Sequence, residues 1–211
     1  MESARYAEAF YAQPGSALPP PPHSLQAHLR KVGPLAWVDV LQLWADVSPE
    51  VRQASLEGNF RLGIWPAAIS RHPEGRWTLA GAEKVPADRM LYPPEKTTGI
   101  PGSLTQGTWN EQAMIYGLCL TGYLALGGRL PYQWREAGLA GEVGRMCVPL
   151  VSLPAVPAGL WGSIARGTHR DVRRRYCDLE SWGGDLQAFL SRYPDPATES
   201  LRDQLERGFF H

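Results

Sequence analysis

The sequence contains little lysine, asparagine or cysteine, and it carries no net charge. Only Lys31, Lys84 and Lys96 are lysines, so arginine supplies nearly all of the 21 basic residues. This usage, with abundant alanine, glycine and proline, is typical of a GC-rich genome and indicates a bacterial or phage origin; the alternative is arginine used for planar, bidentate contacts. A formal net charge of +0 gives no global field, so any attraction to nucleic acid or to a membrane surface requires a local patch.

Cysteine is represented by Cys119, Cys147 and Cys177, without CxxC spacing. Such an odd and sparse set argues against a disulfide framework and against a zinc site. His23 and His28 lie off a single helical face with no acidic motif between them, so we expect no metal and no cofactor. The N-terminal residues lack a basic start followed by an apolar run, which is unlike a secretory signal. We therefore expect a protein of the reducing cytoplasm.

Long hydrophobic runs are also missing. A membrane span needs about 20 apolar residues, and the longest uncharged stretches are interrupted by glycine, threonine or proline, so we expect none. A composition of 44% hydrophobic and 20% charged residues is typical of a globular protein. We expect one globular domain over 24–211 after an N-terminal arm over 1–23. The arm's proline run at 19–22 favours an extended polyproline segment, and a docking peptide for a partner is the alternative.

The clearest element is a helix over about 110–127. Asn110 can accept a hydrogen bond from an orphan backbone N–H, and Gly127 and Gly128 suit the end of the helix. Its apolar residues run around every face, which is typical of a helix buried on all sides. A stripe of small residues recurs every four positions and would let another backbone approach closely; it comprises Ala113, Gly117, Thr121 and Ala125.

The first quarter of the chain predicts further helices. Ser24 can cap a helix over 25–32, which Gly33 ends, and a second helix is expected over 35–47. The Ser48-Pro49-Glu50 triplet combines a cap, a proline and an acid, so it predicts that a separate helix begins there and continues to about residue 57.

The middle of the chain changes character. Short aromatic segments around a turn at 72–75 predict a small antiparallel hairpin within 60–85. A long Pro/Gly-rich loop is expected over 86–107, followed after the buried helix by a short, glycine-interrupted helix within 129–146. Two C-terminal helices are expected over 185–193 and 197–207. The fold class is therefore α+β and rich in helix, with a central buried apolar helix and long Pro/Gly-rich loops.

A basic segment is the strongest candidate for a binding site, and it comprises Arg166, His169, Arg170, Arg173, Arg174 and Arg175. If this segment is helical, as we expect, four of its arginines fall near one face and could bind phosphate groups: Arg166, Arg170, Arg173 and Arg174. The alternative is a solvated face paired with acids at Asp171, Asp178 and Glu180. Trp161, Tyr176 and Trp182 could stack on bases or form the buried side of the helix.

No nucleotide-binding loop, nucleophile elbow or metal motif is present in the sequence. One polar group could assemble at the start of the buried helix from Ser103, Thr105, Thr108, Glu111 and His169. The 8 tryptophans suit core positions and interface anchors. We expect a non-catalytic, macromolecule-binding protein that acts as a subunit of a larger assembly or as an immunity or accessory factor. A nucleic-acid-binding subunit and an enzyme whose residues meet only in the fold are the alternatives.

Overall fold

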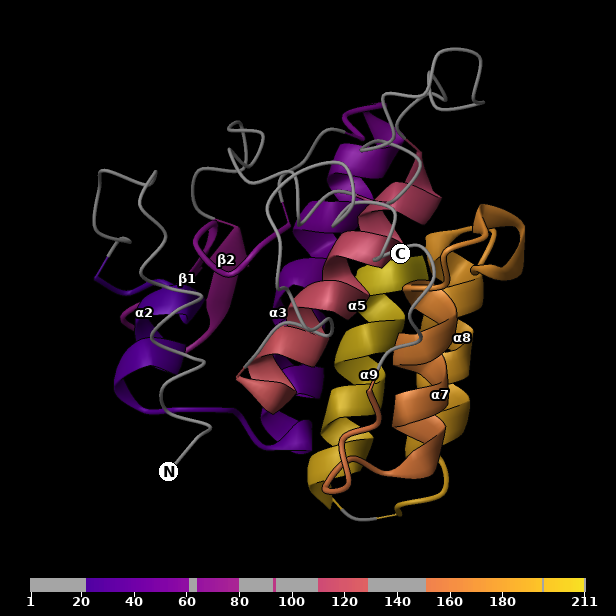
Figure 1. Ribbon diagram of the computed structural model, residues 1–211. Coiled ribbons are helices and arrows are strands. Elements are labelled where there is room, and N and C mark those ends of the chain that lie inside the picture. The colour runs from indigo at the N-terminus through magenta and orange to yellow at the C-terminus, as the bar shows by residue number, and fades with distance from the viewer. Residues whose placement is uncertain are drawn as a thin grey trace, which may run out of the picture.

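The computed structural model describes residues 22–60, 64–79, 93, 110–128, 151–194 and 196–210. Within these ranges the chain is helix-rich, with one two-stranded antiparallel sheet (Figure 1). The α-helices are α2 (Leu25–Lys31), α3 (Trp37–Leu56), α5 (Glu111–Gly127), α7 (Ala158–Gly167), α8 (Leu179–Leu190) and α9 (Pro196–Phe210). The strands are β1 (Ile69–Arg71) and β2 (Trp77–Leu79), and a 3-10 turn, η3, spans Val172–Arg174. The predicted α+β, helix-rich character is confirmed for the described ranges.

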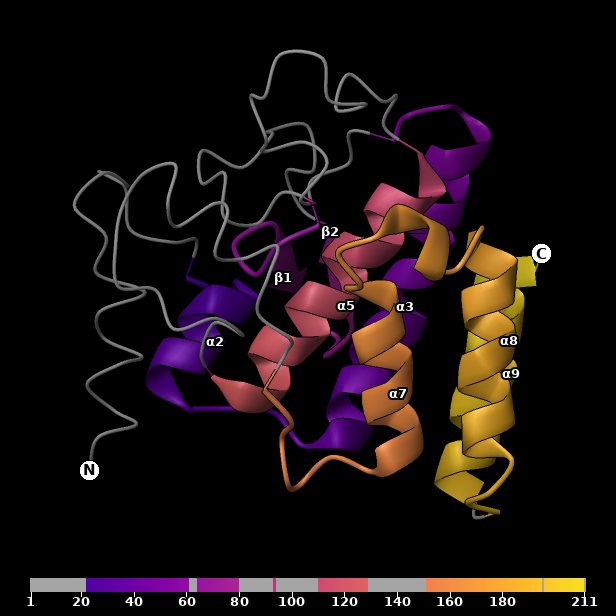
Figure 2. The ribbon, with the colours of Figure 1, turned by 45° about the vertical axis from the view of Figure 1, so that its right-hand side comes forward.

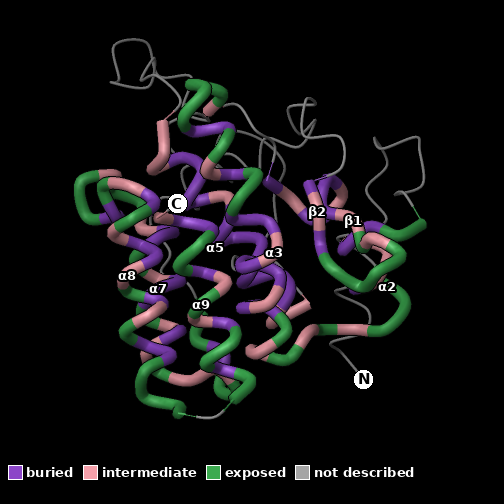
Figure 3. Tube along the Cα trace, turned by 180° about the vertical axis from the view of Figure 1, so that it is seen from behind, coloured by how far each residue is buried: buried purple, intermediate pink, exposed green. Residues whose placement is uncertain are grey.

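The predicted buried helix is α5. The Asn110 side chain accepts a hydrogen bond from the backbone N–H of Ala113 at 3.1 Å. Gly128 adopts the left-handed conformation, with φ of 60°, and its N–H donates to the carbonyl of Leu124. Both ends are therefore closed by interactions that lie within a few residues of the helix. α5 lies in the middle of the helical layer, and most of its residues are buried (Figure 3).

The two helices predicted over 35–47 and 50–57 are one continuous helix, α3, and the predicted start at Ser48 is wrong. Pro49 lacks the N–H that would bond the carbonyl of Ala45. The Ser48 hydroxyl donates to that carbonyl instead, at 3.0 Å. The helix therefore continues through the proline without leaving this buried acceptor unpaired.

α9 packs closely against α3 at the turn that contains Ser48 and Pro49. A Cβ on Gly208 of α9 would lie 1.8 Å from Ser48 Oγ and 3.4 Å from Pro49 Cδ. Only glycine therefore allows α9 to approach the proline turn of α3 this closely. The contact fixes the C-terminal helix against the middle of the long helix.

The small-residue stripe on α5 receives another backbone, as predicted. The Thr121 hydroxyl donates to the carbonyl of Ile64 at 3.2 Å, and a Cβ on Gly117 would lie 3.3 Å from the same oxygen. A second close approach lies off the stripe, where a Cβ on Gly122 would lie 2.2 Å from the Trp44 ring. α5 is therefore positioned by its glycines as much as by its large side chains.

The predicted antiparallel hairpin is present in the described part of its range, whereas residues 61–63 and 80–85 lie outside the described residues. β1 and β2 pair antiparallel, with Arg71 opposite Trp77, and Gly75 in the intervening turn has φ of 93°. The Asp46 carboxylate accepts from the Trp77 N–H and the Glu50 carboxylate from the Leu79 N–H, both at 2.8 Å. Residues four positions apart on a helix are separated by about 6 Å along its axis. Residues two positions apart on a strand are separated by about 6.8 Å, so the spacing of the two carboxylates on α3 matches the spacing of the two N–H groups on β2.

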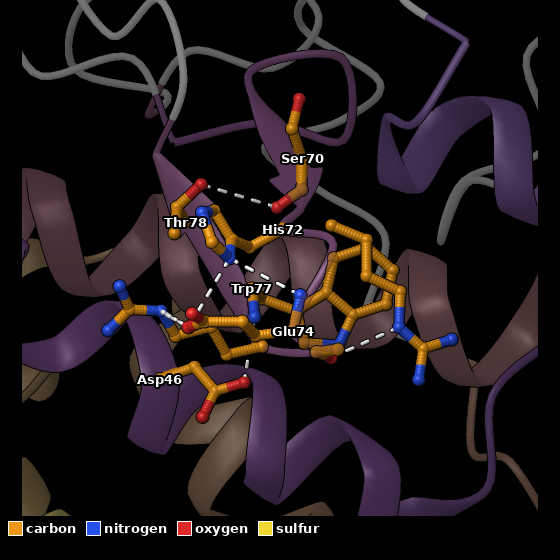
Figure 4. A network of polar contacts seen from close by, with 9 residues as sticks. Asp46, Ser70, His72, Glu74, Trp77 and Thr78 are labelled. Carbon is orange, nitrogen blue, oxygen red and sulfur yellow. Dashed lines mark hydrogen bonds and ion pairs between the residues drawn. The ribbon is translucent and has the colours of Figure 1, made fainter.

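Figure 4 shows the first of these bonds, with Asp46 reaching from α3 to the backbone at the start of β2. On the other side of β2 the Thr78 hydroxyl donates to the carbonyl of Ser70 at 3.4 Å. At the turn, His72 Nδ1 lies 3.5 Å from a Glu74 carboxylate oxygen. The outer N–H groups of β2 are therefore covered by α3 and are not a free pairing edge.

Aromatic rings fill the core where α3, α8 and α9 meet. The Trp44 and Trp182 rings meet edge to face at a centroid distance of 5.1 Å, and the Phe209 ring meets Trp182 at 5.2 Å. Seen in Figure 2, α8 and α9 run side by side and α2 lies at the opposite side with the hairpin. The core positions expected for tryptophan are confirmed for Trp44, Trp77 and Trp182.

Both C-terminal helices exist, but their bounds differ from the prediction. α8 begins at Leu179 rather than at residue 185 because Asp178 forms a reciprocal capping box with Ser181. α9 extends from Pro196 to Phe210. Other predictions fall outside the described residues, namely residues 1–21 of the arm, the loop at 86–107 apart from Pro93, and the helix within 129–146. No helix in the described ranges is long and apolar enough to cross a membrane.

Candidate functional site

Apart from Arg166, which lies in the last turn of α7, the basic segment forms the connection between α7 and α8 and does not form the predicted helix. α7 ends at Gly167, where a Cβ would lie 2.3 Å from Cys119 Sγ on α5. The Thr168 hydroxyl donates to the carbonyl of Ile164 at 2.7 Å and closes the last turn. Residues 172–174 then form the 3-10 turn η3. The arginines are therefore presented by a turn rather than along one helical face.

Local hydrogen bonds hold the backbone of this turn. Asp171 Oδ1 accepts from the Arg173 N–H at 3.0 Å, and the Asp171 N–H donates to His169 Nδ1 at 3.0 Å. From α5, Gln112 Nε2 donates to the carbonyl of Val172 at 3.1 Å. We refer to residues 168–175 as the arginine turn. Its conformation is fixed from within and from the start of the buried helix.

Arg175 is the anchor of the arginine turn. It is only 3% exposed, and its Nε donates to the carbonyl of His169 at 2.6 Å. Its guanidinium lies 4.8 Å from the centroid of the Tyr116 ring on α5. Buried charge of this kind is tolerated where hydrogen bonds and ring faces replace water. Arg175 therefore positions the turn and is not available to an external phosphate.

Arg166 flanks the turn at the end of α7. Its guanidinium lies 4.1 Å from the centroid of the Tyr176 ring. The Tyr176 hydroxyl donates to the Asp185 carboxylate, and its oxygen lies 3.2 Å from Ser163 Oγ. Burial, and then the bond to Asp185, raise the pKa of Tyr176, so the ring stays neutral. The exposed Arg166 side chain is thus held against a fixed platform.

Three arginines remain on the outside of the arginine turn: Arg170, Arg173 and Arg174. The Arg174 side chain is 74% exposed, and its Nε lies 3.9 Å from Asp171 Oδ2. An exposed pair at this distance contributes little to stability and is easily exchanged for another anion. His169 is half-buried, and its Nδ1 accepts from the Asp171 N–H. Three of the six predicted residues are therefore exposed on the arginine turn.

The aromatic residues near the turn belong to the interior. Tyr176 is 1% and Trp182 0% exposed, and the Trp182 Nε1 donates to Ser163 Oγ at 3.2 Å. Trp161 is half-buried, 6.1 Å from the Tyr123 ring. The alternative in which these rings form the buried side of the segment is confirmed for Tyr176 and Trp182.

Glu111 has a role that sequence reasoning missed. Its carboxylate accepts from the Ser55 hydroxyl and, through Oε2, from the Leu179 N–H at 2.9 Å. The side chain therefore joins the end of α3 to the starts of α5 and α8. Its position in a first helical turn was the only signal in the sequence, and the two donors are remote along the chain. Of its proposed polar partners, His169 bonds to Asp171 instead, and Ser103, Thr105 and Thr108 lie outside the described residues.

The Cys119 thiol lies in the interior of the fold. Burial raises the pKa of the Cys119 thiol, which keeps it protonated and unreactive. In the ranges that the structure describes, no group of three or more His, Cys, Asp or Glu residues is placed to hold a metal ion. No known protein family matches this chain, and no curated protein is similar to it in sequence.

Proposed function

We propose that this chain is a non-catalytic, macromolecule-binding protein of bacterial or phage origin, and that the arginine turn is its contact surface. The observation that carries the proposal is that Arg170, Arg173 and Arg174 are exposed on a backbone held at both ends. A surface that is ordered before binding loses little conformational entropy when a partner arrives. Arginine is also among the residues that contribute most at binding interfaces.

The use of carboxylates in the fold favours binding over catalysis. Asp46, Glu50, Glu111, Asp171 and Asp178 each accept a hydrogen bond from a backbone N–H. Each of these acids therefore stabilises a helix start, a turn or a strand edge. Such a framework suits a subunit of a larger assembly, or an immunity or accessory factor, that offers a rigid surface to its partner. The unpaired thiols of Cys119 and Cys177 suit the reducing cytoplasm in which we place it.

A pull-down from the native host with tagged protein tests this function. The lysate is divided into nuclease-treated and untreated halves, and bound material is identified by mass spectrometry and absorbance. The test variant is Arg170→Ala/Arg173→Ala/Arg174→Ala. The control, matched in charge, replaces three exposed arginines elsewhere, Arg30, Arg76 and Arg207, with alanine.

The proposal predicts a partner that the wild type and the control retain and the test variant loses. Recovery of the chain alone, or equal recovery by both triple variants, would overturn it. A partner that survives nuclease treatment would be a protein, which is the assembly or immunity interpretation. A partner removed by nuclease would identify the nucleic-acid-binding subunit, which is the second candidate and which the exposed guanidinium groups favour.

A further inference from the structure

The geometry of the arginine turn points to the class of its partner, and this inference rests on the function proposed above. We propose that Arg170, Arg173 and Arg174 bind the phosphate backbone of double-stranded nucleic acid without reading its base sequence. Arg166 flanks this contact, and Arg175 is a positioning residue.

Phosphate is the ligand that the exposed groups fit. The three guanidinium groups come from five consecutive positions, and each can present paired N–H donors to phosphate oxygens. Asp171 is the sole carboxylate within 168–175. Its Oδ1 is engaged by the Arg173 N–H, and its other oxygen lies 3.9 Å from Arg174 Nε. Residues 168–175 thus contain four arginines and one carboxylate, although the whole chain has a formal net charge of +0.

Buried rings favour a duplex over a single strand. Proteins that bind single strands usually stack bases on aromatic side chains. Beside the arginine turn, the rings of Tyr116, Tyr176 and Trp182 are 2%, 1% and 0% exposed, and two of them already lie under arginines. Within the described ranges, the contact therefore depends on charge. Charge density is higher on a duplex, with one phosphate per about 1.7 Å of helix axis.

The shape of the turn disfavours base readout. Sequence is read by a helix or a two-stranded ribbon that enters the major groove. The exposed arginines lie on a connection whose regular part, η3, has only 3 residues. Such a turn can contact the backbone but does not project a row of side chains toward base edges. Binding should therefore vary little among duplexes of different sequence.

Salt dependence measures the number of phosphates contacted. Three contacts predict a slope of about −2.7 in log K against log salt, so affinity should fall about 40-fold between about 50 and 200 mM salt. If all five arginines from Arg166 to Arg175 made contacts, the slope would be about −4.5 and the loss about 500-fold. The burial of Arg175 and the stacking of Arg166 predict the smaller value.

Fluorescence anisotropy with the full chain tests the inference. The probes are a labelled duplex of about two helical turns, roughly 20 base pairs, a second duplex of unrelated sequence, and a single strand of the same length. We expect similar affinity for both duplexes, weaker binding of the single strand, and a slope near −2.7. The Arg170→Ala/Arg173→Ala/Arg174→Ala variant should lose this binding, while the Arg30→Ala/Arg76→Ala/Arg207→Ala control keeps it.

Several results would overturn the inference: tighter binding of the single strand, strong preference for one duplex, a slope near −4.5, or equal loss in both triple variants. Circular dichroism of each variant establishes that it is folded. If the wild type ignores the duplex but captures a nuclease-resistant protein that the arginine-turn variant loses, the nucleic-acid inference fails and the proposed function stands. If neither ligand is bound, both fail.

Discussion

Replacing Gly122 with alanine tests whether the close approach of α5 to the Trp44 ring positions the core. The added Cβ would lie 2.2 Å from Cζ2 and 2.9 Å from Cε2 of Trp44. Carbon atoms pack best at about 3.5–4.0 Å, so the ring or the helix would have to move by more than about 1 Å.

The Trp44 indole has little freedom to move. It is fully buried, its Nε1 donates to the carbonyl of Leu118 at 3.1 Å, and its ring meets Trp182 at 5.1 Å. Over-packing of a core costs about 1–3 kcal/mol, and losing the indole hydrogen bond adds about 1 kcal/mol. The gain in helix propensity from glycine to alanine offsets about 1 kcal/mol. We therefore expect a net loss of roughly 2 kcal/mol, which lowers Tm by about 4–8 °C in a chain of this size.

Gly184 provides the matched control. It also lies inside a helix, but a Cβ there meets nothing within 4 Å. Gly184→Ala should therefore raise stability by up to about 1 kcal/mol. Thermal unfolding followed by far-UV circular dichroism measures both variants, and near-UV spectra report on the tryptophans. If Gly122→Ala is as stable as Gly184→Ala, the packing argument is refuted. In a Trp44→Phe background, which removes the clashing ring atoms, Gly122→Ala should cost less.

Three further predictions concern polar groups. Ser48→Ala should destabilise by about 1–3 kcal/mol, since the Ala45 carbonyl loses its donor beside Pro49; urea unfolding measures this. Glu111→Ala should cost about 1–3 kcal/mol, because the Ser55 hydroxyl and the Leu179 N–H both lose their acceptor, and the same unfolding assay applies. Burial, and then the Arg71 charge, lower the pKa of His28 below 6.5. The unfolded chain therefore binds this proton more readily, so stability should decrease as the pH falls below 6.5; Tm across this range measures the effect.

The controls for these variants follow from the same contacts. Ser191→Ala removes a comparable hydroxyl bond to a helical carbonyl at an exposed site and should be nearly neutral. His28→Gln should flatten the pH dependence of Tm just below 6.5. If the pH dependence of Tm is the same in His28→Gln as in the wild type, groups other than His28 cause it. The pKa of Asp178 is lowered chiefly by hydrogen bonds from Cys177 and Ser181. The stability that this residue contributes is therefore lost only as the pH falls below about 3.8, outside the pH range of the His28 effect.

Helix ends were predictable where the capping partners are close in sequence. The Asn110 side chain bonds the Ala113 N–H, and the Ser24 side chain bonds the Ala27 N–H at 3.1 Å. These bonds span three residues, so the residue types alone indicate them. The all-round apolar surface of α5 likewise predicted burial because no side of that helix suits water.

The start predicted at Ser48 failed because local and tertiary interactions compete there. A serine before a proline is a good cap, but the same hydroxyl can satisfy the Ala45 carbonyl when the helix continues. Gly208 brings α9 against this turn of α3. The choice between two helices and one therefore depended on a helix at the other end of the chain.

The conformation of the arginine turn also depends on contacts with segments that are distant in the sequence. The sequence by itself specified a cluster of arginines with acids at Asp171, Asp178 and Glu180. Only the tertiary structure decided that α7 stops where Gly167 meets Cys119, and that Arg175 is buried over Tyr116 while its neighbours face outward. Charge and capping are properties of neighbouring residues, whereas burial depends on which distant segments fold against them.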